Sequence, residues 1–335
     1  MQPSQRLLIG LDAVKAAPRR AVVTVGVFDG IHRAHQQLIR TTTQTARQLN
    51  GTSVVVTFDP DPQSVLDPTH AQPILMPLEV RVRRLLELGI DWVWVIPFTK
   101  RFARTTAERF IRHVLVDRLR AAALIVGSSF VFGRSRQGDL RVLKRVGPHL
   151  GMQVLPVQEM REGRAPISSS RVRRLLAGGR LLLAARLLGR APALYGVVVR
   201  GVGRGRRLGF PTANVQLRSC AFPPAGVYAV MVRVIDWSSW SRDPARSSRE
   251  RVLPPSRSPV WNGMMNFGVR PTFGPGPLVC EVHLLGFSGT LLGRAVEVSL
   301  LRRLRSERCF SGPEALRRQL HRDMEKARQL FARSS

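Results

Sequence analysis

The chain has 335 residues, enough for two domains of ordinary size, and its hydrophobic content of 44% excludes a disordered chain. Its formal net charge of +31 favours an acidic ligand such as a nucleotide, and it leaves open a second class, arginine-rich proteins that bind nucleic acid nonspecifically. No uncharged apolar run reaches the roughly 18 residues of a membrane span, and three widely spaced cysteines do not suit a disulfide framework. We therefore expect a cytoplasmic protein with no membrane partner.

Residues 22–40 predict a strand, a turn and the start of a helix. The apolar run 22–27 is typical of a buried strand, residues 28–30 break it, and a helical pattern follows. His32 and His35 are three residues apart, so they should share one face of the first helical turn, where two imidazoles can stabilise a growing negative charge. A metal pair or two surface histidines would be the alternative, but no further ligand is obvious nearby. The turn also points backbone N–H groups at a phosphate, and its expected phosphate-binding residues are Gly26, Phe28, Asp29 and Gly30.

Predicted strands and helices alternate over the next part of the chain. This alternation indicates a mostly parallel sheet wrapped by helices. Ligands of such sheets bind at the carboxyl ends of the strands, where His32, Asp59 and Ser129 fall. The predicted elements are strands over 52–58, 92–96 and 122–126, and helices over 78–88 and 106–119, the latter capped by Thr105 or Thr106.

A cluster of hydroxyl groups precedes a predicted helix within residues 164–174, and it consists of Ser168, Ser169 and Ser170. These serines can cap the helix, and with Arg171 and Arg173 they can bind phosphate oxygens. An ordinary serine cap with exposed arginines is the alternative. The histidine pair upstream favours the phosphate interpretation, because both clusters suit the same kind of ligand.

From residue 193 onward, short alternating strands and glycine-rich turns replace the long helices. Residues 236–259 are rich in serine, arginine and proline, which predicts a flexible inserted loop. The second half is therefore expected to be an antiparallel barrel or sandwich with a closing helix. The predicted strands are 195–199, 227–234, 279–285 and 294–301, and the helix is 312–333.

Residues 201–214 combine glycines, arginines and a Pro-Thr-Ala-Asn sequence. Thr212 and Asn214 can offer oxygen ligands to Mg²⁺. A glycine-rich hairpin turn would explain the glycines but not the Pro-Thr-Ala-Asn sequence, and the absence of Gly-Lys-Ser/Thr excludes a P-loop. Flexible glycines allow backbone N–H groups to wrap a polyphosphate, and the expected phosphate contacts are Gly203, Arg204, Gly205 and Pro211.

Two sets of motifs resemble known families. Residues 26–35 are similar to the Gly-x-Phe-Asp-Gly-x-His-x-Gly-His signature of cytidylyltransferase-like nucleotidyltransferases, and residues 167–173 resemble the motif that closes the same site. Residues 211–214 resemble the Mg·ATP motif of riboflavin kinases, and further matches to that family follow at 226–228, 270–273, 281–283 and 305–310. In this order the two halves resemble bacterial bifunctional riboflavin kinase/FMN adenylyltransferases, over residues 22–328.

The resemblance implies a two-domain architecture and two reactions. Residues 1–185 would form a Rossmann-like α/β nucleotidyltransferase domain with a parallel sheet, and residues 186–335 an antiparallel β-barrel kinase domain with a C-terminal helix. The second domain would phosphorylate riboflavin to FMN with ATP. The first domain would convert FMN and ATP to FAD and pyrophosphate.

The resemblance also implies roles for single residues. Glu281 would be the general base of the kinase, with Thr212 and Asn214 as ligands of Mg²⁺. His32 and His35 would stabilise the α-phosphate during adenylyl transfer. The outgoing pyrophosphate would be held by Ser168, Ser169 and Arg173, and the flavin is expected at Ser129, Arg305, Glu307 and Phe310.

Four residues depart from the family motifs around the adenylyl-transfer pocket: Ala34, Asp61, Ser129 and Ser170. Each change is mild, but the loss of one preorganised donor can reduce a rate by about 10²–10³-fold. A kinase whose first domain no longer transfers adenylyl groups is therefore the first alternative, and an arginine-rich nucleic-acid-binding protein is the second. The formation of FAD from FMN distinguishes the two enzyme interpretations.

Overall fold

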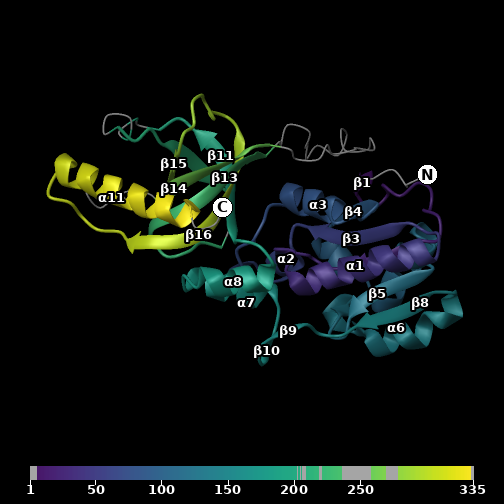
Figure 1. The fold of residues 1–335 in the computed structure, drawn as a ribbon. Coiled ribbons are helices and arrows are strands. Elements are labelled where there is room, and N and C mark those ends of the chain that lie inside the picture. Colours follow the sequence, from purple (N-terminus) through teal and green to yellow (C-terminus); the bar gives the residue numbers. More distant parts are fainter. Residues whose placement is uncertain are drawn as a thin grey trace. The chain divides into compact units, whose positions relative to one another are not determined.

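The structure, a computed structural model of the chain, describes residues 6–201, 203, 205, 209–218, 221–235, 258–268 and 278–332. By their contacts the described residues form two compact units (Figure 1). Residues 6–72 and 78–168 make up the first unit, and residues 73–77, 169–235 and 258–332 make up the second. Over the described ranges, no helix is both long enough and apolar enough to cross a membrane.

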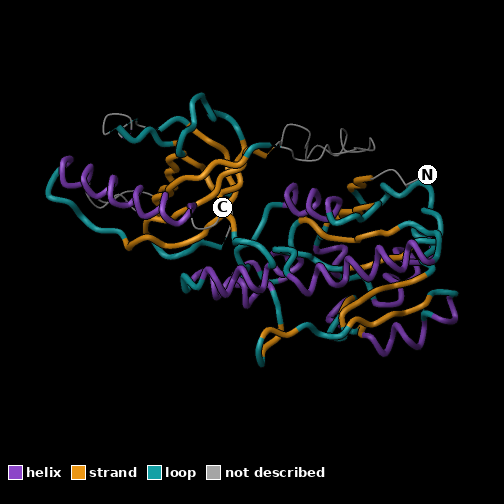
Figure 2. The backbone as a smooth tube through the Cα atoms, viewed as in Figure 1, coloured by secondary structure: helices purple, strands orange, loops and turns teal. Residues whose placement is uncertain are grey.

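The first unit contains a six-stranded sheet with the order β1-β4-β3-β2-β5-β8. Strands are drawn in orange in Figure 2. Every neighbouring pair is parallel, which confirms the predicted parallel sheet. The chain places β3 and β4 on one side of β2 and then β5 on the other, so the strand order reverses between β2 and β5. Ligands of open α/β sheets bind at such a reversal. The strands are β1 (Arg6–Ile9), β2 (Val22–Val25), β3 (Ser53–Asp59), β4 (Trp92–Pro97), β5 (Ala123–Gly127) and β8 (Gln153–Val157).

Helices cover both faces of this sheet, because both faces are apolar. Leu38 and Ala46 of helix α1 (Arg33–Gln48) and its C-cap residue Leu49 pack against one face, next to Val22 and Ile125. The opposite face packs against α5 (Ala107–Phe110), the residues that follow it, and α6 (Leu140–Val146). The short elements are α2 (Pro62–Leu66), η1 (Pro68–His70), α4 (Lys100–Ala103), η3 (Arg134–Arg136), η4 (Pro148–Leu150), β6 (Val131–Phe132), β7 (Gly138–Asp139), β9 (Arg161–Glu162) and β10 (Ala165–Pro166).

The helix predicted over 106–119 differs from the expectation after its first turn. Thr106 caps α5, since its Oγ1 accepts a hydrogen bond from the backbone N–H of Arg109 at 3.3 Å. The following segment η2 (Ile111–Arg118) winds as a π-helix, with Ile111, Val114 and Leu115 buried. The spacing of the apolar residues does not reveal this wider winding, because the same buried positions would also suit an α-helix.

Six antiparallel strands close into a barrel in the second unit, with the order β11-β12-β15-β14-β13-β16 and β16 paired to β11. Of the two predicted architectures, the barrel is therefore the one observed. Strands β12 and β14 were not predicted. The strands are β11 (Ala193–Val199), β12 (Ala213–Leu217), β13 (Gly226–Ile235), β14 (Val260–Gly268), β15 (Val279–Leu284) and β16 (Ala295–Ser306).

The described helices of the second unit are α7 (Ser169–Ala177), α8 (Leu181–Leu188) and α11 (Pro313–Ala332). The predicted C-terminal helix is confirmed as α11, which lies along the barrel in Figure 1. Ala327 and Phe331 of this helix pack against Ala229 of β13 and Met264 of β14. A six-stranded barrel is filled by its own side chains, so this contact identifies the outer face of β13 and β14.

Candidate active sites

The two predicted histidines stack at the start of α1, beyond the carboxyl end of β2. His32 is the N-cap residue, and its Nδ1 accepts a hydrogen bond from the backbone N–H of His35 at 3.3 Å. The ring centroids lie 3.6 Å apart and the ring planes differ by 15°. Both imidazoles therefore lie on one face of the helix N-terminus, as their spacing predicts, beside backbone N–H groups that favour an anion.

The turn that leads to this pair has a strained backbone. Phe28 and Ile31 have φ angles of +54° and +40°, a left-handed conformation that residues with side chains rarely adopt. Both side chains are 1% exposed, and Gly30 between them has φ +79°. Strain of this kind persists where the surroundings hold it, and it is frequent at functional sites. Asp29 in the same turn is also buried.

The surroundings of His35 lower its pKa well below the ordinary value. Burial of the ring is the largest cause, followed by the electrostatic effects of His32 and Arg81. Its Nδ1 has no hydrogen-bond partner within the described part of the chain. His35 is therefore a neutral imidazole with an unused polar atom, which suits contact with a polar ligand.

The other predicted residues of the first unit lie at the same edge of the sheet. Asp59 is the last residue of β3, and Ser129 is exposed in the turn that follows β5. Because β2, β3 and β5 are neighbouring parallel strands, their carboxyl ends and the residues that follow share one edge. Asp61 caps α2, with its Oδ1 accepting from the backbone N–H of Gln63 at 2.8 Å.

The serine cluster lies at the start of α7, which begins at Ser169. Ser170 and Arg173 are in the same helix, and the Nε of Arg173 donates to the carbonyl of Pro73 at 2.7 Å. Helix α7 belongs to the second unit, whereas the histidines belong to the first. A phosphate site shared by the histidines, Ser168 and these residues stays a prediction.

In the second unit the residues predicted for the kinase lie opposite each other on adjacent strands. Asn214 of β12 is the register partner of Glu281 of β15, and Glu281 is also the partner of Asn266 of β14. Directly opposed residues of antiparallel strands project to the same face, with Cβ atoms about 4.5–5.5 Å apart. Asn266 lies two residues from Met264, so this row is on the outer face, where α11 packs. Asn266 was missed, because its strand was not predicted.

Two glycines of the 201–214 segment approach the predicted Mg²⁺ ligands so closely that no side chain would fit. A Cβ atom on Gly201 would lie 1.9 Å from Nδ2 of Asn214. A Cβ atom on Gly205 would lie 2.8 Å from Oγ1 of Thr212 and 2.3 Å from the carbonyl oxygen of Phe210. The glycines therefore allow the backbone to fold directly over Thr212 and Asn214. Gly203 is exposed with φ +73°, Pro211 is exposed, and Arg204 lies outside the described residues.

The residues predicted to bind flavin are linked to α11. The Nε of Arg305 donates to Oδ2 of the fully buried Asp323 at 2.7 Å, and Gln319 donates to Oδ1 of the same carboxylate at 2.7 Å. The guanidinium of Arg305 also lies over the ring of Phe310, 5.4 Å from its centroid. Helix α11 thus positions this segment. The carboxylate of Glu307 lies against Gly268, where an added Cβ would approach it to 2.4 Å.

The remaining predicted features are the motif at 270–273, the 236–259 insertion and the cysteines. Residues 270–273 and most of the 236–259 insertion lie outside the described residues. Of the cysteines, Cys309 is exposed and Cys280 is buried, and burial raises the pKa of the Cys280 thiol. Groups of three or more His, Cys, Asp or Glu side chains that could hold a metal ion do not occur among the described residues.

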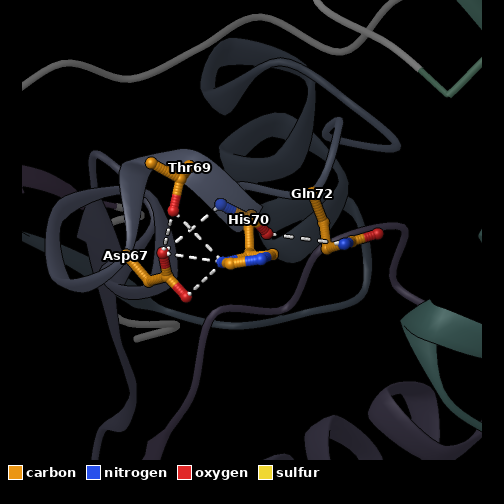
Figure 3. Close-up of polar contacts among 4 residues, drawn as sticks. All are labelled: Asp67, Thr69, His70 and Gln72. Carbon is orange, nitrogen blue, oxygen red and sulfur yellow. Dashed lines mark hydrogen bonds and ion pairs between the residues drawn. The ribbon is translucent and has the colours of Figure 1, made fainter.

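A further group of polar side chains lies around the turn after α2 and contains one histidine, His70 (Figure 3). His70 and Thr69 both hydrogen-bond to the carboxylate of Asp67, at 2.9 Å and 2.7 Å, and Gln72 donates to the carbonyl of His70 at 3.4 Å. The Thr69 and His70 hydrogen bonds lower the pKa of Asp67. Thr69, His70 and Gln72 are exposed, and Asp67 caps the short 3₁₀ turn that contains Thr69 and His70.

The parallel sheet and the closed antiparallel barrel correspond to two matched family models, and together these define a two-domain transferase. The family model described as FAD synthetase matches residues 14–171, and the one described as riboflavin kinase matches residues 188–331. The chain is a member of the bifunctional riboflavin kinase/FMN adenylyltransferase family, which confirms the resemblance seen in its motifs.

Curated relatives with this description match along nearly their whole length. The Escherichia coli K12 protein is 37% identical over 97% of this chain and 98% of its own length. The Pseudomonas fluorescens protein is 36% identical, covering 98% and 99%, and the Bacillus subtilis protein is 31% identical, covering 95% of both. A solved structure from Streptococcus pneumoniae, described as a macrolide-efflux protein, has a TM-score of 0.80 and 27% identity over 96% of this chain and 98% of that one.

Proposed function

We propose that this chain catalyses both activities named for its relatives: it phosphorylates riboflavin to FMN in the second unit, and it adenylylates FMN to FAD in the first. ATP is the co-substrate of each step. The observation that carries the proposal is the register of Asn214 opposite Glu281. Two strands far apart in the sequence pair so that the predicted Mg²⁺ ligand and the predicted base share one face.

The kinase reaction requires a carboxylate beside bound ATP. Phosphoryl transfer to a primary alcohol is assisted by a base that removes the hydroxyl proton, and Glu281 has this role. The side-chain oxygens of Thr212 and Asn214 fit Mg²⁺, a hard cation that prefers oxygen ligands. When bound there, Mg²⁺ would neutralise charge on the phosphates of ATP. The close approach of Gly201 and Gly205 supports this arrangement, because it brings backbone over both ligands.

Adenylyl transfer uses the histidine pair. The phosphate of FMN attacks the α-phosphorus of ATP, and His32 and His35 donate hydrogen bonds to oxygens on which negative charge increases. The motif resemblance alone assigns the outgoing pyrophosphate to Ser168, Ser169 and Arg173, whose hydroxyl and guanidinium groups suit phosphate oxygens. The stacked rings and the low pKa of His35 support this role, since a preorganised neutral donor avoids repulsion of Arg81.

The four departures from the family motifs raise the question whether the chain is a bifunctional enzyme or a kinase whose first unit is inactive. Asp61 has a structural role as the cap of α2, and Ser129 is exposed in its turn, so both positions tolerate their side chains. The decisive measurement is chromatography of FAD after incubation of the purified protein with FMN, ATP and Mg²⁺. FAD formation at the pace of riboflavin phosphorylation supports two working sites. Unchanged FMN alongside phosphorylated riboflavin would leave a kinase with an inactive first unit.

The proposed partners are small molecules in the cytoplasm, and nucleic-acid binding is at most nonspecific. The net charge of +31 attracts any polyanion. If nucleic-acid binding were the main function, the affinity for DNA would decrease steeply with salt concentration. The protein would then also consume no ATP when it is incubated with riboflavin.

A further inference from the structure

Arg81 is a buried arginine at the centre of the first unit. It lies on α3 (Leu78–Glu87), and its side chain is 5% exposed. Arginine is rarely buried without partners for its charge. One nitrogen, NH1, donates to the carbonyl of Val27 at 2.7 Å, and NH2 donates to the carbonyl of Phe58 at 3.1 Å. A single guanidinium therefore joins the carboxyl ends of two neighbouring strands, β2 and β3.

The Val27 carbonyl is the last acceptor before the strained turn. Phe28 follows it directly in the left-handed conformation, and the turn ends at His32. A second donor also reaches this carbonyl, because Oγ1 of the buried Thr57 lies 3.2 Å away. Arg81 and Thr57 thus hold the peptide group from which the turn starts, and they hold it from inside the protein.

The charge of Arg81 interacts with nearby carboxylates and with His35. Burial lowers the pKa of Arg81, and four carboxylates oppose that effect: Asp29, Asp59, Asp61 and Glu79. A guanidinium remains charged under these conditions. The same charge contributes, after burial and His32, to the lowered pKa of His35. The charged groups that act on His35 are therefore His32, the N-cap of α1, and Arg81 of α3, and the four carboxylates surround Arg81.

We propose that Arg81 is a positioning residue for adenylyl transfer, because its guanidinium holds the turn that presents His32 and His35. The proposal rests on the function proposed for the first unit. Arg81 does not touch the reacting atoms in this account. It acts through the Val27 carbonyl, from which the turn starts, and its charge adds to the effects of burial and His32 on His35.

Two substitutions separate the geometric role from the charge. Arg81→Lys keeps a positive charge, but an ammonium group does not offer the planar fork that reaches two carbonyls. We expect kcat for FMN adenylylation to decrease about 10²-fold with little change in the KM for ATP. Arg81→Met loses the charge as well, so the acid limb of the pH profile of kcat should move to higher pH. A merely structural role would not move that limb.

Several controls keep the test decisive. Arg112→Met removes an exposed arginine of the same unit and should leave both activities unchanged. Riboflavin phosphorylation by each variant should equal that of the wild type. Thr57→Val removes the other donor to Val27 with little change of shape, and it tests the turn even if Arg81→Met does not fold. Its effect and that of Arg81→Lys should not add, because both act on one carbonyl.

Wild-type kcat and an unchanged acid limb in folded Arg81→Lys and Arg81→Met proteins would overturn the proposal, as would wild-type kcat in Thr57→Val. A wild-type protein that makes no FAD would overturn the proposed function instead. In that case the effect of Arg81 on His35 is tested by NMR titration of His35 in the wild type, Arg81→Lys and Arg81→Met. Equal titration midpoints in the wild type and Arg81→Met would refute an electrostatic influence of Arg81 on His35.

Discussion

At the scale of single residues, His32 performs two tasks with the two nitrogens of one ring. Because Nδ1 accepts the backbone N–H of His35, the neutral ring carries its proton on Nε2. The hydrogen bond that caps α1 therefore also sets the tautomer and leaves Nε2 as a donor. His35 is stacked on this ring, and its own proton affinity is reduced by the environment that holds it.

The lowered pKa of His35 predicts a pH-dependent stability. An unfolded histidine takes up a proton near the ordinary pKa of 6.5, whereas folded His35 resists protonation. The unfolded state then binds more protons, so this contribution to stability is complete above pH 6.5 and is lost as the pH falls below that value.

We expect His35→Gln to reduce the loss of stability between about pH 7.5 and about pH 5.5, measured by urea denaturation. His149→Gln, at an exposed position, is the control and should lose as much stability as the wild type. The same loss in His35→Gln would contradict the prediction.

At the scale of elements, the kinase site depends on how closely a loop can approach a strand. The row Asn214–Glu281–Asn266 comes from three strands, β12, β15 and β14, and its register places an amide on each side of the carboxylate. The backbone at Gly201 covers one end of that row. The site therefore requires glycine at position 201, because a side chain there would overlap the amide of Asn214.

Gly201→Ala tests this requirement. The added methyl group would meet Nδ2 of Asn214 at 1.9 Å, so the amide or the loop must move. We expect kcat for riboflavin phosphorylation to decrease about 10²-fold, because small displacements at a reacting site have effects of that size. FMN adenylylation should be unchanged. Gly312→Ala, where no atom lies within 4 Å of the added Cβ, is the matched control. Normal phosphorylation by Gly201→Ala would show that the loop is not confined there.

Asp323 of α11 offers an element-scale test of stability. Its carboxylate is fully buried and holds Arg305, whose side chain is 16% exposed. Asp323→Asn leaves the guanidinium without its charged partner, and breaking such a pair typically destabilises a protein by about 3–5 kcal/mol. Denaturation in urea should show this loss, with Glu325→Gln on the exposed face of α11 as the control. A change below about 1 kcal/mol would mean that the pair is dispensable.

The sequence predicts the elements whose pattern is strong, and it misses β1, β8, β12, β14 and α8. The β2–β5 strands of the parallel sheet and the C-terminal helix follow from apolar runs and helical spacing. Strands β12 and β14 escape prediction because they contain asparagine, glycine and other residues that are depleted in strands. The opposition of Asn266 and Glu281 is a matter of register, which local spacing does not encode. Arg81 escapes for another reason, since an arginine in an amphipathic helix normally faces solvent.

At the scale of the whole molecule, two folds divide two consecutive reactions that share ATP. The FMN made by the barrel unit is the substrate of the sheet unit, so each reaction can be followed separately by supplying its own flavin. The predicted catalytic groups do not overlap: Glu281 belongs to the second unit, and the histidines belong to the first. Substitutions at one site should therefore leave the other reaction intact.

Glu281→Ala and His35→Ala test this division directly. Without the carboxylate, riboflavin should remain unphosphorylated, because no group takes its hydroxyl proton, while added FMN should still become FAD at the wild-type rate. Without His35, FMN should accumulate from riboflavin, with FAD formation reduced by about 10²-fold or more. Chromatography of the three flavins measures both steps in one sample, and Glu325→Ala is the control for the loss of a surface carboxylate. If either substitution impaired both reactions equally, the two activities would have to share one site, and the assignment of one reaction to each unit would be wrong.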